Sequence, residues 1–286
     1  MKHRTIYDAK HLQLLPGTLV RAEGSPPSTD VAINEAYDGL GATFDFYLQN
    51  FHRNSIDDAG MPLIASVHYG SNYDNAFWNS QQMVFGDGDV RLFNRFTISL
   101  DVIGHELTHG VTEHTAALAY SGQSGALNES ISDVFGSLIK QYAKKQTAAQ
   151  ADWLIGAGLL APGVKGVALR SMKAPGTAYN DPVLGKDPQP ASMTGYVNTA
   201  GDNGGVHINS GIPNHAFYLA ARKIGGYAWV KAGRIWYETL LDPQAKSSTN
   251  FQGFAKLTVA TAVKLYGANK AEAKAVAGAW HQVGVL

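Results

Sequence analysis

The spacing of apolar residues divides the chain into a strand-rich first part and a helical second part. Between Asp30 and Phe51 apolar side chains recur at three- and four-residue intervals, which predicts a long helix with Asp30 as its N-cap. Apolar runs at 63–69 and 82–85 predict strands. The turn at 86–89 lacks the later acidic positions of a calcium-binding loop, and we interpret it as a solvated hairpin turn.

After residue 100 the pattern becomes helical. One helix is predicted to begin with Asp101 as its N-cap, and a second spans about 126–143 with a single apolar stripe. Residues 145–210 are rich in proline and glycine and predict long loops, which tend to be functional in compact domains. Further amphipathic helices are predicted near 213–224, 229–241, 250–266 and 270–282. The succession predicts an α+β fold.

Composition narrows the class of protein. The 286 residues carry no net formal charge, which argues against nucleic acid or an anionic membrane as partner. The absence of cysteine excludes disulfides and thiolate metal sites. No apolar run is long enough to predict a membrane span. The basic start, Met1 to Arg4, is not followed by an apolar segment, so no signal peptide is expected in this sequence.

The strongest chemical signal is the sequence His-Glu-Leu-Thr-His at 105–109. On a helix, His105 and His109 lie on one face and aim two imidazoles at one point, an arrangement that suits Zn²⁺. Glu106 is adjacent, where a carboxylate can act as a general base. Because the pattern arises by chance in roughly one chain in a hundred of this length, a third ligand is needed.

The second helix can supply that ligand. Glu129 follows His109 by twenty residues, a span that allows a helix–loop–helix to return its carboxylate to the histidines. Asp133 lies one turn further on and can accept the N–H of a ligating histidine. Alone, both carboxylates would be interpreted as solvated; beside the histidine motif they favour a metal site.

Beyond these residues, the chain resembles the thermolysin-like zinc metalloproteases over nearly its whole length, most of all the protealysin-type enzymes. The resemblance implies a strand-rich N-terminal lobe (1–117) and a helical C-terminal lobe (118–286), with the zinc-motif helix at the floor of the cleft between them. Besides the zinc motif, it rests on the motifs Asn75–Trp78, Gly125–Glu129, Ala168–Met172 and Asp202–His207.

The resemblance assigns a role to each metal-site residue. His105, His109 and Glu129 are expected to bind one catalytic Zn²⁺, with water in the fourth position. Glu106 is expected to take a proton from that water and pass it to the leaving amine.

The resemblance also implies donors for the oxyanion of the transition state. These are Tyr120 and His207, with Asp202 orienting His207. From the residues alone, Tyr120 would be interpreted as a core aromatic and His207 as a loop histidine.

Substrate contacts follow from the same resemblance. Asn75 and the backbone at Ala76 match a strand edge that pairs with an extended peptide. Arg170 matches an arginine that holds a substrate carbonyl just beyond the scissile bond. The wall of a hydrophobic pocket for the side chain on the amine side of the cut is implied for Phe96, Val102 and Leu169. Core packing is the alternative for these three.

Calcium is expected to be largely or wholly absent. Of the positions that match the family's calcium pair, Asp101 and Asp152 are retained, whereas Lys140 stands where the family has a ligating glutamate. Calcium needs six to eight oxygen ligands and would be repelled by an ammonium. Lys140 is therefore predicted to pair with Asp101, Asp152 or both. Other acidic family positions are replaced by Leu154, Ala157, Ala22, Gly24, Pro26 and Val167.

Together these features predict a monomeric zinc endopeptidase that cuts peptides and proteins before bulky hydrophobic residues. The resemblance further implies secretion, and a propeptide and N-terminal β-segment that lie outside this sequence. A peptide-binding pseudoenzyme with structural zinc would need neither Glu106 nor His207. An intracellular aminopeptidase would need an acidic anchor for the substrate amine, and none is found. No role is assigned to His3, His11, His52, His68, His114, His215 and His281.

Overall fold

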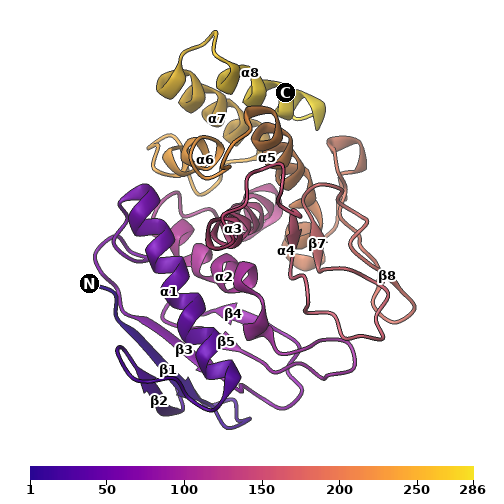
Figure 1. The fold of residues 1–286 in the computed structure, drawn as a ribbon. Coiled ribbons are helices and arrows are strands. Elements are labelled where there is room, and N and C mark those ends of the chain that lie inside the picture. The colour runs from indigo at the N-terminus through magenta and orange to yellow at the C-terminus, as the bar shows by residue number, and fades with distance from the viewer.

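The computed structural model describes residues 1–286, and its N-terminal part holds a five-stranded sheet in the order β2-β1-β3-β5-β4 (Figure 1). Strands β1, β3 and β5 run parallel, whereas β2 and β4 are antiparallel edge strands. The strands are β1 (Arg4–Asp8), β2 (Thr18–Ala22), β3 (Leu63–Val67), β4 (Ala76–Trp78) and β5 (Met83–Phe85). The C-terminal loops add the short pairs β6 (Leu154–Ile155) with β7 (Arg170–Ser171) and β8 (Asn180–Asp181) with β9 (Gly185–Lys186).

Helices cover the sheet and build the C-terminal part. Helix α1 packs against β1 and β3 and also contacts α2, while α5 to α8 gather at the opposite end of the molecule (Figure 1). The predicted α+β class is confirmed, with a sheet in the N-terminal part and mainly helices in the C-terminal part; the lobe boundary at residue 117 stays a prediction. The helices are α1 (Val31–Phe51), α2 (Leu100–Glu113), α3 (Gly122–Ala143), α4 (Asp202–Asn209), α5 (Gly211–Ile224), α6 (Ala232–Leu240), α7 (Phe251–Tyr266) and α8 (Ala271–Gln282), with 3₁₀ turns at Phe96–Ile98 and Met193–Gly195.

Two glycines allow α2 and α3 to approach closely at the centre of the molecule. A Cβ added to Gly136 would lie 2.3 Å from the carbonyl oxygen of Asp101, and one added to Gly104 would lie 2.7 Å from a methyl carbon of Ile139. Since no side chain fits between the helices at these points, the glycines set the spacing. This close packing brings polar side chains of α3 beside the zinc-motif helix α2.

Most predicted elements are present, with three corrections. The Asp30 carboxylate accepts the Ala32 N–H at 2.8 Å, which confirms the N-cap of α1. Asp101, however, is not an N-cap, because α2 begins at Leu100 with Ser99 as its cap residue. The turn at 86–89 is not a hairpin turn, since the chain leaves the sheet after β5. Helix α4 lies within residues 145–210, where the sequence predicted only loops.

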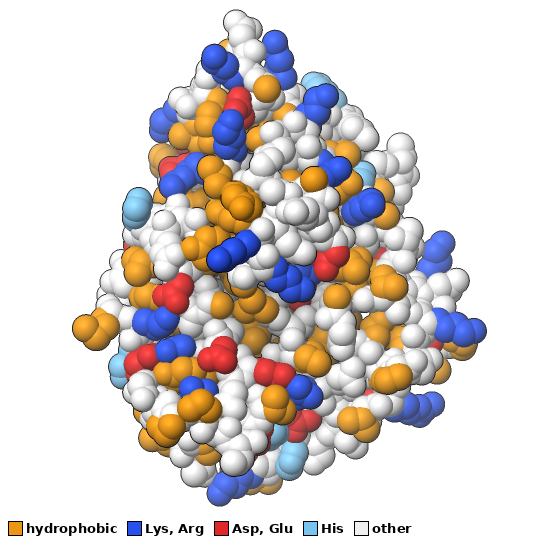
Figure 2. All heavy atoms as spheres, in the orientation of Figure 1, with side chains coloured by type: hydrophobic (Ala, Val, Ile, Leu, Met, Phe, Trp, Pro, Cys, Tyr) orange, Lys and Arg blue, Asp and Glu red, His pale blue; other side chains and the backbone are white.

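On the face shown in Figure 2, basic and acidic side chains are interspersed with apolar ones, in keeping with the balanced charge. None of the helices combines the length and the apolar character required to cross a bilayer.

Candidate active site

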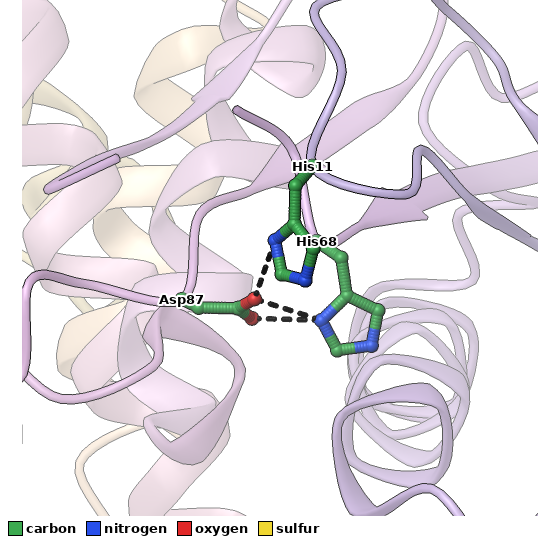
Figure 3. A group of neighbouring side chains, drawn as sticks. All are labelled: His11, His68 and Asp87. Atoms are coloured by element: carbon green, nitrogen blue, oxygen red, sulfur yellow. Dashed lines mark hydrogen bonds and ion pairs between the residues drawn. The ribbon is translucent and has the colours of Figure 1, made fainter. Parts of the chain in front are cut away.

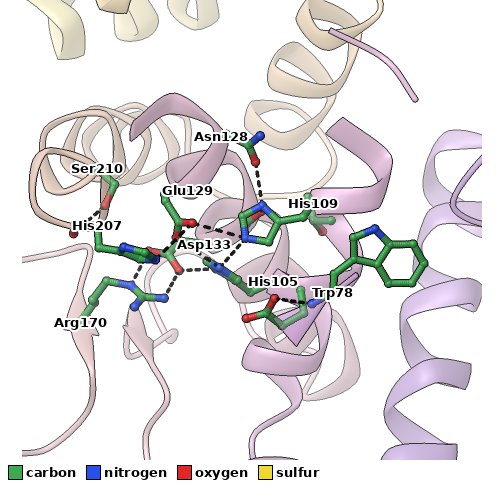
Figure 4. A network of polar contacts seen from close by, with 12 residues as sticks. Trp78, His105, His109, Asn128, Glu129, Asp133, Arg170, His207 and Ser210 are labelled. Atoms are coloured by element: carbon green, nitrogen blue, oxygen red, sulfur yellow. Dashed lines mark hydrogen bonds and ion pairs between the residues drawn. The ribbon is translucent and has the colours of Figure 1, made fainter. Parts of the chain in front are cut away.

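Helices α2 and α3 bring His105, His109 and Glu129 to one point at the floor of a cleft of about 540 Å³ (Figure 4). The two Nε2 atoms lie 3.1 Å apart. The Glu129 carboxylate faces them, with one oxygen 3.4 Å from His105 Nε2 and the other 3.5 Å from His109 Nε2. Helical spacing places both imidazoles on one face of α2, and the turn between the helices returns α3 to that face.

The outer nitrogen of each histidine is held by a hydrogen bond. His105 Nδ1 donates to Asp133 at 2.8 Å, and His109 Nδ1 donates to the Asn128 carbonyl oxygen at 2.7 Å. Asn128 is fixed in turn, because its amide donates to the Leu118 carbonyl at 3.0 Å. These bonds leave the Nε2 lone pairs directed at the shared point. The structure thus places Asp133 where it orients a histidine, and it adds Asn128, which the motif did not indicate.

The donor set fits a zinc ion. Two imidazole nitrogens and one carboxylate are the ligands of many catalytic zinc sites, which leave one position open. Burial alone would raise the pKa of Glu129, but His109 and His105 hold it well below its usual range, so its carboxylate stays ionised. The open side of the three groups faces the cleft.

Glu106 points into the same cleft from α2. The backbone N–H of Trp78, in edge strand β4, donates to its carboxylate at 3.2 Å. Burial raises the pKa of Glu106, and the positive character of His105 and His109 opposes the rise. A carboxylate with a raised pKa accepts a proton more readily than an exposed one, as a general base requires. The Trp78 contact could not be read from the sequence.

Helix α4 carries His207 to the other side of the cleft. The first four residues of the helix, Asp202 to Gly205, all have a positive φ, a conformation that suits the sequence Asp-Asn-Gly-Gly. Asp202 is thereby folded back: one oxygen accepts the His207 backbone N–H at 2.8 Å and the other lies 2.5 Å from His207 Nδ1. The same left-handed run breaks helical periodicity, which is why the sequence did not predict α4.

Tyr120 lies between His207 and the candidate metal ligands. Its hydroxyl donates to Glu129 and lies 3.2 Å from His207 Nε2. Burial and the Glu129 carboxylate raise the pKa of Tyr120, so the phenol keeps its proton. The structure therefore gathers Tyr120, His207 and Asp202 beside the three candidate ligands.

Arg170 reaches the site through Asp133. Its Nε and Nη2 donate to the two Asp133 oxygens at 2.8 and 2.7 Å, and the Asn214 amide donates to the same carboxylate at 2.8 Å. Burial lowers the pKa of Arg170, but the adjacent Asp133 outweighs it and the pKa is raised. Arg170 thus buttresses the carboxylate that orients His105, a contact that was not predicted.

The expected substrate-binding residues fall into two groups. Asn75 and Ala76 line the cleft at edge strand β4. Leu169 lines a second cavity of about 180 Å³. Its other apolar walls include Phe93, Leu160, Leu184 and Ile208, which the sequence did not indicate. Phe96 and Val102 are not among the residues that line this cavity, and both are buried in the hydrophobic core. Their burial is in keeping with core packing, the alternative given above, and their place in a substrate pocket stays a prediction.

Behind the site, Lys140 occupies a buried position between α3 and the chain near residue 154. Its Nζ lies 2.8 Å from Asp101 and 2.9 Å from Asp152, and it donates to the Leu154 carbonyl at 2.6 Å. The ion pair predicted from the sequence is confirmed. Asp101 is fully buried and also accepts from Ser99 and from the Gly156 N–H.

Comparison with known proteins agrees with this geometry. Residues 2–113 match the catalytic domain of the thermolysin metallopeptidases, and residues 116–285 match their α-helical domain. An extracellular metalloprotease of Pectobacterium carotovorum is 60% identical over 99% of this chain and 81% of its own length. A thermolysin of Alicyclobacillus acidocaldarius is 40% identical over 98% of this chain and 50% of its own.

A solved structure, the precursor of protealysin from Serratia proteamaculans, superposes with a TM-score of 0.98 at 61% identity. It is matched over 100% of this chain and 88% of its own. The fold is that of the thermolysin metallopeptidases, and two histidines and one glutamate converge where a metal ion could bind. The chain belongs to the thermolysin family of metallopeptidases, and it is accordingly a zinc-dependent endopeptidase.

Proposed function

We propose that this endopeptidase cleaves extended peptides before a bulky hydrophobic residue, with His105, His109 and Glu129 as its zinc ligands. The observation that carries the ligand assignment is the convergence of two Nε2 atoms 3.1 Å apart with an ionised, buried carboxylate. When bound, zinc supplies a Lewis acid for the scissile carbonyl and lowers the pKa of a water to about 7.

Glu106 is the general base of the reaction. It lies beside the ligands without joining them, and the Trp78 N–H fixes the orientation of its carboxylate. It accepts the proton of the attacking water and delivers it to the leaving amine. The raised pKa of Glu106 brings its proton affinity closer to those of the attacking water and the leaving amine. This favours both the uptake of the proton from the water and its delivery to the amine.

Tyr120 and His207 stabilise the oxygen on which negative charge develops. Both polar groups line the cleft, and Asp202 fixes the His207 ring through Nδ1, so that Nε2 faces the substrate. Donors held in place before the reaction stabilise a transition state without reorganisation.

The substrate pairs with the open edge of β4 at Asn75 and Ala76 and places one side chain in the cavity beside Leu169. His207 borders both the cleft and this cavity, which connects the two. Phe93, Leu160, Leu169, Leu184 and Ile208 give the cavity a largely apolar wall, and its volume of about 180 Å³ suits a leucine- or phenylalanine-sized side chain. Arg170, at the cavity wall, is positioned to meet the substrate carbonyl with the part of its guanidinium that does not bind Asp133.

A quenched peptide assay tests this specificity. Cleavage should occur before Leu or Phe, fall at least tenfold when Asp or Lys replaces that residue, and stop when a zinc chelator is added. The fall follows from the cost of placing a charge in an apolar cavity. Equal cleavage before Asp and Leu would contradict the pocket assignment, whereas activity that survives complete zinc removal would contradict the ligand assignment.

His207→Ala should lower kcat by about 10²–10³-fold, the usual effect of removing one oxyanion donor. The KM for short peptides should change little, because this donor acts mainly on the transition state. Steady-state kinetics distinguish the two parameters. His281→Ala, at an exposed position in α8, is the matched control and should leave both unchanged. A change confined to KM would assign His207 to ground-state binding.

Secretion, processing and assembly are part of the proposal. The Pectobacterium relative is named as extracellular, and the Serratia neighbour is a precursor. By this likeness we place the mature enzyme outside the cell and expect it to be made with a propeptide; that it acts as a monomer stays a prediction.

We further propose that Lys140 takes the place of structural calcium. Its ammonium binds the Asp101 and Asp152 carboxylates and the Leu154 carbonyl, three oxygen groups that a cation would otherwise neutralise. A positive charge fixed at this point repels Ca²⁺, and too few further oxygen ligands remain to hold it.

A further inference from the structure

A second cluster of metal-ligating side chains lies at the carboxyl ends of three adjacent parallel strands. His11 follows β1 by three residues, His68 follows β3 directly, and Asp87 comes two residues after β5. Such strand ends meet at one edge of a sheet, the usual place for ligands in parallel sheets. In Figure 3 both imidazoles turn toward the Asp87 carboxylate. His68 Nδ1 lies 2.9 Å from an Asp87 oxygen, and His11 Nδ1 lies 3.5 Å from the same oxygen.

The backbone around the cluster is held in an uncommon conformation. His11 and His68 both have left-handed backbones, with φ of 58° and 54°. Such values are uncommon outside glycine and mark positions where the surrounding structure enforces the geometry. Here the enforcing contact is a backbone hydrogen bond from the His11 N–H to the His68 carbonyl at 2.8 Å. This bond holds the backbone at His11 beside the backbone at His68.

His68 is also oriented from behind. Its Nε2 donates to the carboxylate of Asp30, the N-cap residue of α1, at 2.9 Å, which leaves Nδ1 directed at Asp87. This is the carboxylate–histidine relation that supports metal ligands. The same relation holds at the active site, where Asp133 binds the outer nitrogen of His105.

We propose that His11, His68 and Asp87 bind a second divalent transition-metal ion, with Zn²⁺ as the ion to test. The ligand atoms all lie within 4.8 Å of one another. Tetrahedral zinc with ligands at about 2.0–2.2 Å needs ligand atoms about 3.3 Å apart, close to the 2.9 and 3.5 Å found here. Two imidazoles favour zinc or a neighbouring transition metal over calcium, which prefers oxygen. The exposed side of His11 leaves room for water as the remaining ligand.

The ion would join the strand ends to the loop that leads into the substrate-binding edge. Asp87 is flanked by Gly86 and Gly88, whose N–H groups donate to the carbonyls of Asn75 and Tyr73 at 3.0 and 3.2 Å. A metal held by Asp87 therefore stiffens the segment before β4 and stabilises the sheet without touching the catalytic groups. The competing state is metal-free, with a protonated His68 bridging Asp30 and Asp87.

Metal content of the intact holoenzyme tests the site. The protein is equilibrated with zinc buffered at micromolar free concentration, separated from unbound metal and analysed by elemental mass spectrometry. We expect two zinc ions per chain in the wild type and one in His11→Asn and in Asp87→Asn. Asparagine tolerates the left-handed backbone of residue 11, so His11→Asn should fold normally. His281→Asn, at an exposed histidine outside the cluster, is the control and should bind two.

Two further measurements locate the second ion. Further zinc, added to protein whose catalytic site is already loaded, should raise the melting temperature of the wild type by several degrees and leave that of His11→Asn unchanged. An anomalous map at the zinc edge should show one peak at His105, His109 and Glu129 and another between His11, His68 and Asp87. When only one zinc ion per chain is supplied, peptidase activity should be the same in the wild type and in His11→Asn. One zinc per chain in the wild type, or two in every variant, would overturn the site.

Discussion

Glu106→Gln is expected to lower kcat by about 10⁴-fold or more while the protein keeps its zinc. Glutamine preserves the shape of the side chain and its contact with the Trp78 N–H, but it cannot accept a proton. General-base catalysis alone contributes about 10²–10⁴-fold, and the effect grows where the base also generates the nucleophile. Because Glu106 lies outside the converging group of His105, His109 and Glu129, the substitution removes no metal ligand.

The measurement combines kcat on a hydrophobic peptide with zinc content per chain. Glu113→Gln is a matched control, since Glu113 lies on the same helix, lines the same cleft and is exposed. That variant should stay within a few-fold of wild type. Loss of zinc from Glu106→Gln would make Glu106 a ligand, and ordinary activity would remove it from the mechanism altogether.

The parts of the site that could be predicted from the sequence are those fixed by regular spacing. Two histidines four residues apart on a helix must share a face, so His105 and His109 were predictable from periodicity. Glu129 could be expected because only a short connection separates the two helices. The two-part α+β architecture followed from the change of period near residue 100.

What could not be predicted depends on contacts between distant segments. Asn128 accepts a hydrogen bond from His109, and Asn214 donates one to Asp133. No rule of sequence spacing indicates either position. Helix α4 escaped notice because its first turn is left-handed and breaks the periodicity. His11 and His68 come together only because β1 and β3 pair in parallel, a topology that the sequence does not reveal on its own.

Lys140→Ala should be strongly destabilising. The substitution leaves Asp101 fully buried with no opposing charge, and breaking a buried ion pair in this way costs about 3–5 kcal/mol. Asp152 is partly exposed and contributes less, because water screens its charge. At about 2–4 °C per kcal/mol, the melting temperature should fall on the order of 10 °C. Thermal unfolding followed by circular dichroism measures it, and Lys256→Ala, an exposed lysine in α7, should change it little.

The response of the melting temperature to calcium shows whether Lys140 replaces a calcium ion or only forms a stabilising ion pair. If the Lys140 ammonium occupies the place of the cation, neither added calcium nor a calcium-selective chelator should shift the melting temperature of the wild type. Lys140→Glu should instead gain a stabilisation by calcium, because it exchanges the repelling charge for a carboxylate beside Asp101, Asp152 and the Leu154 carbonyl. A large calcium-dependent shift in the wild type, or a calcium ion bound beside Asp101 and Asp152 in a crystal, would contradict the replacement. A calcium response confined to Lys140→Glu would show that one side chain determines whether this position holds an ion or an ammonium.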